Sequence, residues 1–183
     1  FEVPCENFSS KTDIYLHGVF SRMFDRQGLH SKGKTRRLIA LLKEYDPDVI
    51  HLHNLHGYYL NYPLLFRYLK RSGKQVRWTL HDCWAFTGHC AYFSYVGCEK
   101  WKTGCYQCPQ KHSYPKSLLL DRSKRNYRLK KQWFTCLDES QMTLITPSEW
   151  LAGLVRQSFL GKYEVTVKRN QIDRNIFYPR DPA

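Results

Sequence analysis

Two hydrophobic patterns alternate along this chain of 183 residues. Apolar residues three or four positions apart are typical of amphipathic helices, whereas short apolar runs bounded by polar turns are typical of buried strands. The first pattern predicts helices over Ile14–Gln27, Thr35–Tyr45, Tyr58–Lys70, Leu118–Leu137 and 147–160. The second pattern predicts strands over 48–53, 74–80, 142–146 and 163–170.

Apolar spacing and turn residues indicate how the first two helices pack and where they end. The first ends at Gly28 and has a stripe of the kind that faces a core, formed by Leu16, Val19, Phe20, Met23 and Phe24. The second ends at Asp46-Pro47, and its buried stripe is expected to contain Leu38, Ile39, Leu41 and Leu42.

A capping box is expected at the start of the last helix. Thr146 can act as the N-cap, Pro147 suits the first helical position, and Glu149 follows three residues after the cap. Gly161 then ends the helix.

Strands that alternate with helices predict right-handed crossovers and a parallel, Rossmann-like α/β sheet. Ligands of such sheets bind beyond the carboxyl ends of the strands. Three polar segments follow predicted strands and should share that edge, namely His53-Asn54, His81-Asp82 and Thr146–Glu149.

The histidines at this edge suit the recognition of hydroxyl groups. His81 can orient or polarise a hydroxyl, and Asp82 can bond a polyol or set an imidazole tautomer. The alternative is that His81 and Asp82 only cap the loop. His53 and Asn54 can bond a sugar hydroxyl, whereas His51 is expected to pack in the sheet. Trp84 can stack on a sugar ring or belong to the core of the loop.

The irregular segment 81–116 contains a cluster of four cysteines in a C-x7-C-x6-C-x2-C pattern: Cys90, Cys98, Cys105 and Cys108. Such a set suits a closed, structural zinc site with four thiolate ligands. Two disulfides or four free thiols are the alternatives. His89 and His112 are spare ligands, while Cys5, Cys83 and Cys136 are expected to be single thiols.

The composition indicates an anionic partner. The net charge is +13 and the isoelectric point is about 9.5, which suits lipid or nucleic-acid phosphates. Six cations fall on the predicted basic helix and form the expected membrane- or anion-binding set, with a solvated helix face as the alternative: Arg122, Lys124, Arg125, Arg128, Lys130 and Lys131.

We find no leader sequence and no apolar run of about 18 residues. We therefore expect a soluble cytoplasmic protein, peripheral at the inner face of the membrane, and a piece of something longer because the chain lacks an initial Met.

Four motifs together resemble the N-terminal half of bacterial family 4 glycosyltransferases, close to those that build colanic acid and other surface polysaccharides. They are "PDVIHLHNLHGYY", "WTLHDCWAFTGHCAYFSYVGCEKWKTGCYQCP", "TPSEWLAGLVRQSF" and "NQIDRNIFYP". The resemblance implies one half of a GT-B architecture, in which this domain receives a glycan or lipid-linked acceptor. A second domain mainly binds the nucleotide-sugar donor. It also implies sugar transfer with retention and without a metal.

The resemblance places His81 against the reacting sugar. We therefore expect His81 and Asp82 to be catalytic, with acceptor contacts from His53, Asn54, Trp84, His89, Ser148 and Glu149.

The chain departs from the family pattern in three ways. Gln171 stands where the family has glycine, residues 1–12 do not match the first strand and its glycine-rich loop, and the donor domain is absent after Ala183. We therefore expect a single partial domain over 1–183, with the start of the interdomain linker at 170–183 and no turnover alone.

Two other functions compete with this interpretation. The charge, the aromatic residues and the cysteine cluster also fit a zinc-stabilised nucleic-acid-binding module. Because the alternating strands and helices match none of the small recognition folds, we expect no nucleic-acid partner. A catalytically silent scaffold for other glycan enzymes is the third hypothesis.

Overall fold

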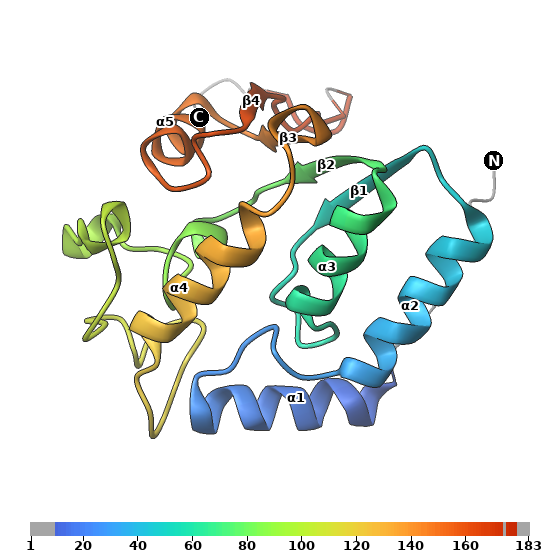
Figure 1. Ribbon diagram of the computed structural model, residues 1–183. Coiled ribbons are helices and arrows are strands. Elements are labelled where there is room, and N and C mark those ends of the chain that lie inside the picture. Colours follow the sequence, from blue (N-terminus) through green and yellow to red (C-terminus); the bar gives the residue numbers. More distant parts are fainter. Residues whose placement is uncertain (1–9, 174, 179–183) are drawn as a thin grey trace.

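The computed structural model describes residues 10–173 and 175–178. The described residues form a sheet of four strands, and Figure 1 shows helices packed beside it. The strands are β1 (Val49–His53), β2 (Gln75–Thr79), β3 (Met142–Thr146) and β4 (Glu164–Val167). The α-helices are α1 (Lys11–Phe24), α2 (Lys32–Tyr45), α3 (Tyr62–Ser72), α4 (Ser123–Phe134) and α5 (Glu149–Gln157). Short 3-10 helices occupy Trp84–Phe86, Ser94–Val96, Lys100–Lys102 and Glu139–Gln141.

The sheet is parallel throughout, with strand order β1-β2-β3-β4. The four predicted strands and the α/β fold class are therefore confirmed. Helices lie between consecutive parallel strands, as βαβ crossovers require. The carboxyl ends of the strands meet at one edge of the sheet.

The core lies between one face of the sheet and the helices that cover it. Trp78 of β2 is buried, and its ring lies 5.7 Å from the ring of Phe66 on α3 and 4.8 Å from that of Phe134 on α4. The alternate residues on the other face of β1 and β2 are exposed: Val49, His51, His53, Gln75 and Arg77. Side chains at the strand ends on this second face are therefore accessible.

The expected capping box of the last helix is wrong. Ser148 is the N-cap, and its hydroxyl accepts a hydrogen bond from the amide of Leu151 at 3.3 Å. Thr146 still belongs to β3 and donates its hydroxyl to the carbonyl of Ser148 at 3.2 Å. Pro147 therefore links strand to cap, and the helix begins at Glu149.

Helix α3 begins later than predicted because the side chain of Asn61 caps it by accepting from the amide of Leu64. Helix α4 is shorter than predicted, and Leu118–Leu120 precede it as exposed loop residues. The last strand covers only half of the predicted 163–170.

The packing expected of α1 is also wrong. The helix ends at Phe24, where Asp25 adopts a left-handed conformation, rather than at Gly28. Its buried residues are the polar His17 and Ser21, while Leu16, Val19 and Phe20 are exposed. The stripe expected on α2 is half-buried, and only Thr35 of that helix is fully buried.

Candidate functional site

Two histidines meet where neighbouring strands end. His53 is the last residue of β1 and pairs in register with Thr79 of β2, two residues before His81. Nδ1 of His53 lies 3.1 Å from Nε2 of His81, and the rings stack with centroids 5.4 Å apart. The parallel register therefore brings together two predicted site residues that are 28 positions apart.

The electrostatic surroundings favour neutral rings on β1. Partial burial lowers the pKa of His53, and the neighbouring His51 and His81 lower it further. Burial, followed by the charges of Arg77 and Lys168, lowers the pKa of His51. A neutral imidazole has one donor and one acceptor nitrogen, so His53 and His81 can share a hydrogen bond.

Asp82 organises the loop that follows His81. Its Oδ1 accepts a hydrogen bond from the amide of Trp84 at 2.8 Å. Its Oδ2 lies 3.0 Å from Nε2 of His56, while Nδ1 of His56 lies 3.3 Å from the hydroxyl of Tyr114. Asp82 is therefore placed to orient His56, which the sequence analysis did not include in the site.

The loop after β1 has its own fixed geometry. Asn54 and Tyr58 adopt left-handed conformations with φ of 36° and 59°. The hydroxyl of Tyr59 donates to the carbonyls of His53 and Asn54, at 3.3 and 3.1 Å. These bonds hold the polypeptide directly beside the histidine pair.

The site is a surface rather than a deep pocket. A cavity of about 10 Å³ between the loops is lined by Asn54, His56, His81, Asp82 and others, which is room for about one water. His53, Asn54 and His81 are exposed. This edge of the sheet therefore presents an open surface of side chains rather than an enclosed cavity.

Two of the expected acceptor contacts are buried. Trp84 is 1% exposed, and its indole nitrogen donates to Oε1 of Gln27 at 2.8 Å. His89 is also 1% exposed, and its Nδ1 lies 2.7 Å from Oδ1 of the fully buried Asp25. Both assignments to an acceptor surface are therefore wrong, because both side chains belong to the interior.

Ser148 and Glu149 begin α5, after the neighbouring strand β3. Ser148 is half-buried and caps the helix, while Glu149 is exposed and lies 3.9 Å from Arg156. Their assignment as acceptor contacts stays a prediction.

Lys130 does not belong to a solvent-facing basic surface. Its ammonium is buried, donates to the carbonyls of Trp84 and Thr87 at 2.7 and 3.0 Å, and lies 3.5 Å from the centroid of a Trp84 ring. The assignment of Lys130 to membrane binding is therefore wrong. The other five cations of the set are exposed or half-buried: Arg122, Lys124, Arg125, Arg128 and Lys131.

The four clustered cysteines and His89 line one small cavity of about 10 Å³. All four are free thiols, so the disulfide alternative is not what the structure shows. A hydrogen bond from Cys90 lowers the pKa of Cys108. Within residues 10–173 and 175–178, no three His, Cys, Asp or Glu side chains are placed to hold a metal ion. The structure therefore gives the predicted zinc site no support.

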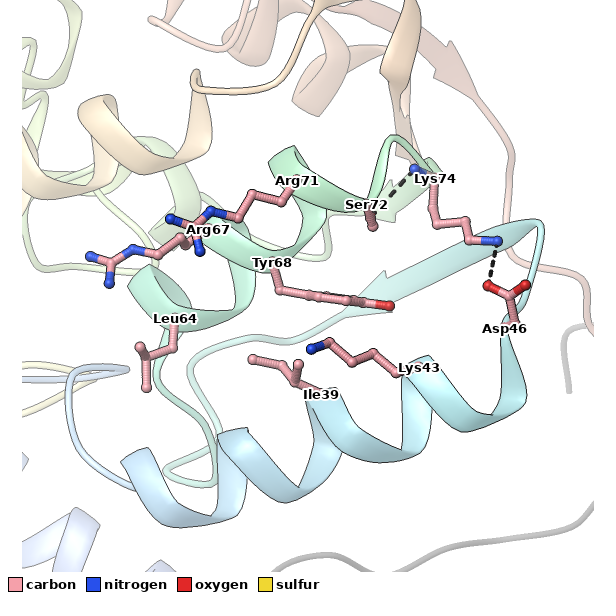
Figure 2. Close-up of a pocket in the computed structure, with 9 residues that line it drawn as sticks. All are labelled: Ile39, Lys43, Asp46, Leu64, Arg67, Tyr68, Arg71, Ser72 and Lys74. Atoms are coloured by element: carbon pink, nitrogen blue, oxygen red, sulfur yellow. Dashed lines mark hydrogen bonds and ion pairs between the residues drawn. The ribbon is translucent and has the colours of Figure 1, made fainter.

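A larger cavity, of about 470 Å³, is a groove between α2 and α3. Figure 2 shows Tyr68 lying between the two helices, with Lys43 on the α2 side and Arg71 on α3. Asp46, which forms an ion pair with Lys74 at 2.7 Å, precedes β1, and Lys74 precedes β2. The groove therefore lies toward the amino ends of the strands, at the edge opposite the histidine pair.

Comparisons with known proteins agree with this fold. Residues 4–174 match the profile of Glycosyltransferase Family 4. The chain is also 32% identical over 157 residues to a protein of Escherichia coli (strain K12) named "Putative colanic acid biosynthesis glycosyl transferase WcaC". That match covers 83% of this chain and 37% of WcaC. The chain thus spans little more than a third of this relative. No solved structure matches.

Proposed function

The chain belongs to glycosyltransferase family 4, and we propose that it forms the acceptor-side part of an enzyme that transfers a sugar from a nucleotide-sugar to a glycan or lipid-linked acceptor. The observation that carries this proposal is the contact between His53 and His81 at the carboxyl edge of the sheet, the edge at which such sheets bind ligands.

His81 is the proposed catalytic residue. Its Nε2 faces His53, which leaves Nδ1 as the ring nitrogen that can bond a hydroxyl of the acceptor or of the reacting sugar. A histidine in this position orients the hydroxyl and stabilises the charge that develops on the reacting atoms during transfer. His53 fixes the ring of His81 and, with Asn54, forms the exposed acceptor surface.

Asp82 is proposed to act through the loop. It holds the amide of Trp84 and the ring of His56, and thereby fixes the backbone that carries His81. A direct contact of Asp82 with the acceptor is a further part of the proposal, because its side chain is 13% exposed.

The donor is proposed to bind mainly a second domain, so that the site is completed in a GT-B cleft and the chain does not turn over alone. The share of WcaC that the chain covers supports this division. We also propose transfer with retention at the cytoplasmic side of the membrane, following the family resemblance. The nucleic-acid alternative has no support from the comparisons.

A structural zinc ion at Cys90, Cys98, Cys105 and Cys108 stays a prediction. It rests on the cysteine pattern of the sequence, because the thiols line one cavity but are not placed to hold a metal ion in the described residues.

The test is transfer by the full-length protein. Radiolabelled uridine and guanosine diphosphate sugars are incubated with polyprenyl-linked oligosaccharides, and label in the lipid fraction is counted. We expect incorporation by the full-length protein, none by residues 1–183 alone, and the anomeric configuration of the donor in the product by NMR. Incorporation by the chain alone would remove the acceptor-side assignment, and an inverted product would remove retention.

A further inference from the structure

Helix α1 presents an apolar face to solvent. Leu16, Val19 and Phe20 are 51%, 40% and 45% exposed, and their spacing of three and four residues puts them on one side of the helix. Tyr15 beside them is also exposed. The opposite side of the helix contacts the protein through polar residues, so this apolar face is not part of the core.

A second apolar segment continues this face. Leu118, Leu119 and Leu120 are all exposed, and the amide of Leu118 donates to the carbonyl of Arg22 on α1 at 2.7 Å. Figure 1 shows α1 lying across the end of the molecule that is farthest from the sheet, with the loop before α4 descending beside it. The two segments therefore protrude together.

Four arginines lie at one end of this apolar face. Arg22 lies on α1, and Arg26, Arg122 and Arg125 lie where α1 ends and α4 begins. Burial lowers the pKa of Arg26, and the charges of Arg122 and Arg125 lower it further, so these guanidinium groups are close enough to repel one another. None of the ion pairs formed within residues 10–173 and 175–178 includes any of the four.

We propose that α1 and Leu118–Leu120, with these four arginines, form a docking surface for an anionic phospholipid bilayer. An apolar face with cations at one end, none of them in an ion pair within the described residues, matches the acyl boundary and the phosphate layer of such a membrane. With 14 residues, α1 is too short to cross a bilayer. None of the described helices is long and apolar enough to do so. The helix would therefore lie in the plane of the interface.

This surface is connected to the candidate site. The loop between β1 and α3 reaches α1, where the ring of Tyr58 lies 5.8 Å from that of His17. The amide of Tyr62 donates to the carbonyl of Gly28, just beyond α1, at 2.9 Å. Docking would thus bring the strand-end histidines toward lipid-linked acceptors. The delivery of a lipid-linked acceptor rests on the proposed function, whereas the binding of this surface to a bilayer does not.

The experiment is cosedimentation of the purified protein with vesicles of phosphatidylcholine, with and without phosphatidylglycerol. We expect binding that requires phosphatidylglycerol and weakens with salt. Replacing Leu16 and Val19 by Ser should lower the partition coefficient at least about tenfold. The double variant Arg122→Gln/Arg125→Gln should lower it on anionic vesicles by about fivefold for each charge.

The chain offers matched controls. Tyr45→Ser removes an aromatic ring that is 81% exposed on α2, and Arg67→Gln/Arg71→Gln removes two charges from the groove of Figure 2. Both should bind almost as the wild type does. All variants should keep the wild-type melting temperature, because the changed side chains are at least partly exposed.

Three results would overturn the proposal. They are equal binding to neutral vesicles, equal loss in the controls, and a dimer in analytical ultracentrifugation that dissociates when Leu16 and Val19 are replaced. The last result would assign the surface to a second copy of the chain. Vesicle binding needs neither donor nor acceptor, so its failure is distinguishable from a failure of the glycosyltransferase assignment.

Discussion

Replacing the buried Lys130 by Met should change how the stability of the protein depends on pH. Burial lowers the pKa of this ammonium to about 7, from an ordinary value of 10.5, although nearby acidic groups oppose the shift. These groups are, in order, Asp25, Cys105, Cys90 and Asp82. Met has a similar length and no charge, so the variant removes the titration while it fills most of the space.

The sign follows from proton counts. Between pH 7 and 10.5 the unfolded chain holds the Lys130 proton more fully than the folded protein does. The free energy of unfolding of the wild type therefore rises with pH in this window, by up to about 1.4 kcal/mol per pH unit. Over the whole window the gain relative to the Met variant is about 5 kcal/mol at most. Below pH 7 the difference in free energy of unfolding between the wild type and the Met variant should be constant.

Urea denaturation at pH 7, 8 and 9, with reductant present, measures this difference. Tyrosines and distant cysteines titrate in both proteins, so their contributions cancel between wild type and variant. Lys124→Met changes an exposed lysine of the same helix and should show no such trend. If the difference in free energy of unfolding between wild type and Lys130→Met stays constant from pH 7 to 9, the pKa of Lys130 is not lowered by burial and the reasoning is refuted.

Four further experiments have definite expected outcomes. Gly88→Ala should lower the free energy of unfolding in urea by about 2 kcal/mol or more, because the added Cβ would lie 2.3 Å from the carbonyl oxygen of Ser123. The control Gly104→Ala adds a Cβ in open space and should leave the free energy of unfolding nearly unchanged. Ser148→Ala should cost about 1 kcal/mol in thermal unfolding, since it removes the N-cap of α5. Asp82→Asn should reduce transfer by the full-length protein about tenfold in the radiolabel assay, because the amide keeps the bond to Trp84 and weakens the contact with His56. Elemental analysis should find about one zinc per chain if the cysteine-rich loop holds a metal, and a metal-free protein with reactive thiols would end that prediction.

The sequence was most informative where local patterns dominate. The strands at 48–53 and 74–80 were expected from their apolar runs, and parallel pairing then determined that His53 and His81 meet at one edge. The shared edge follows from strand period and topology, whereas the contact between the two rings also depends on the register that pairs His53 with Thr79.

The errors arose where long-range packing overrides local patterns. The apolar spacing of α1 suggested a buried face, but spacing does not tell whether a core or another surface receives it. The interior instead holds Lys130 and the pair Asp25 and His89, which lie 64 residues apart and have no signal in sequence spacing. The prediction that Thr146 caps α5 is wrong because β3 extends to that residue. The hydroxyl of Ser148 caps the helix instead.

The most direct test of the account is the rate of sugar transfer by full-length protein carrying His81→Ala. His112→Ala is the control, since it removes an exposed histidine from the loop. We expect kcat/KM to fall by about 10² to 10⁴ for His81→Ala, with an unchanged melting temperature and wild-type rates for His112→Ala. Wild-type transfer by His81→Ala would contradict the assignment of the strand-end histidines to the reaction.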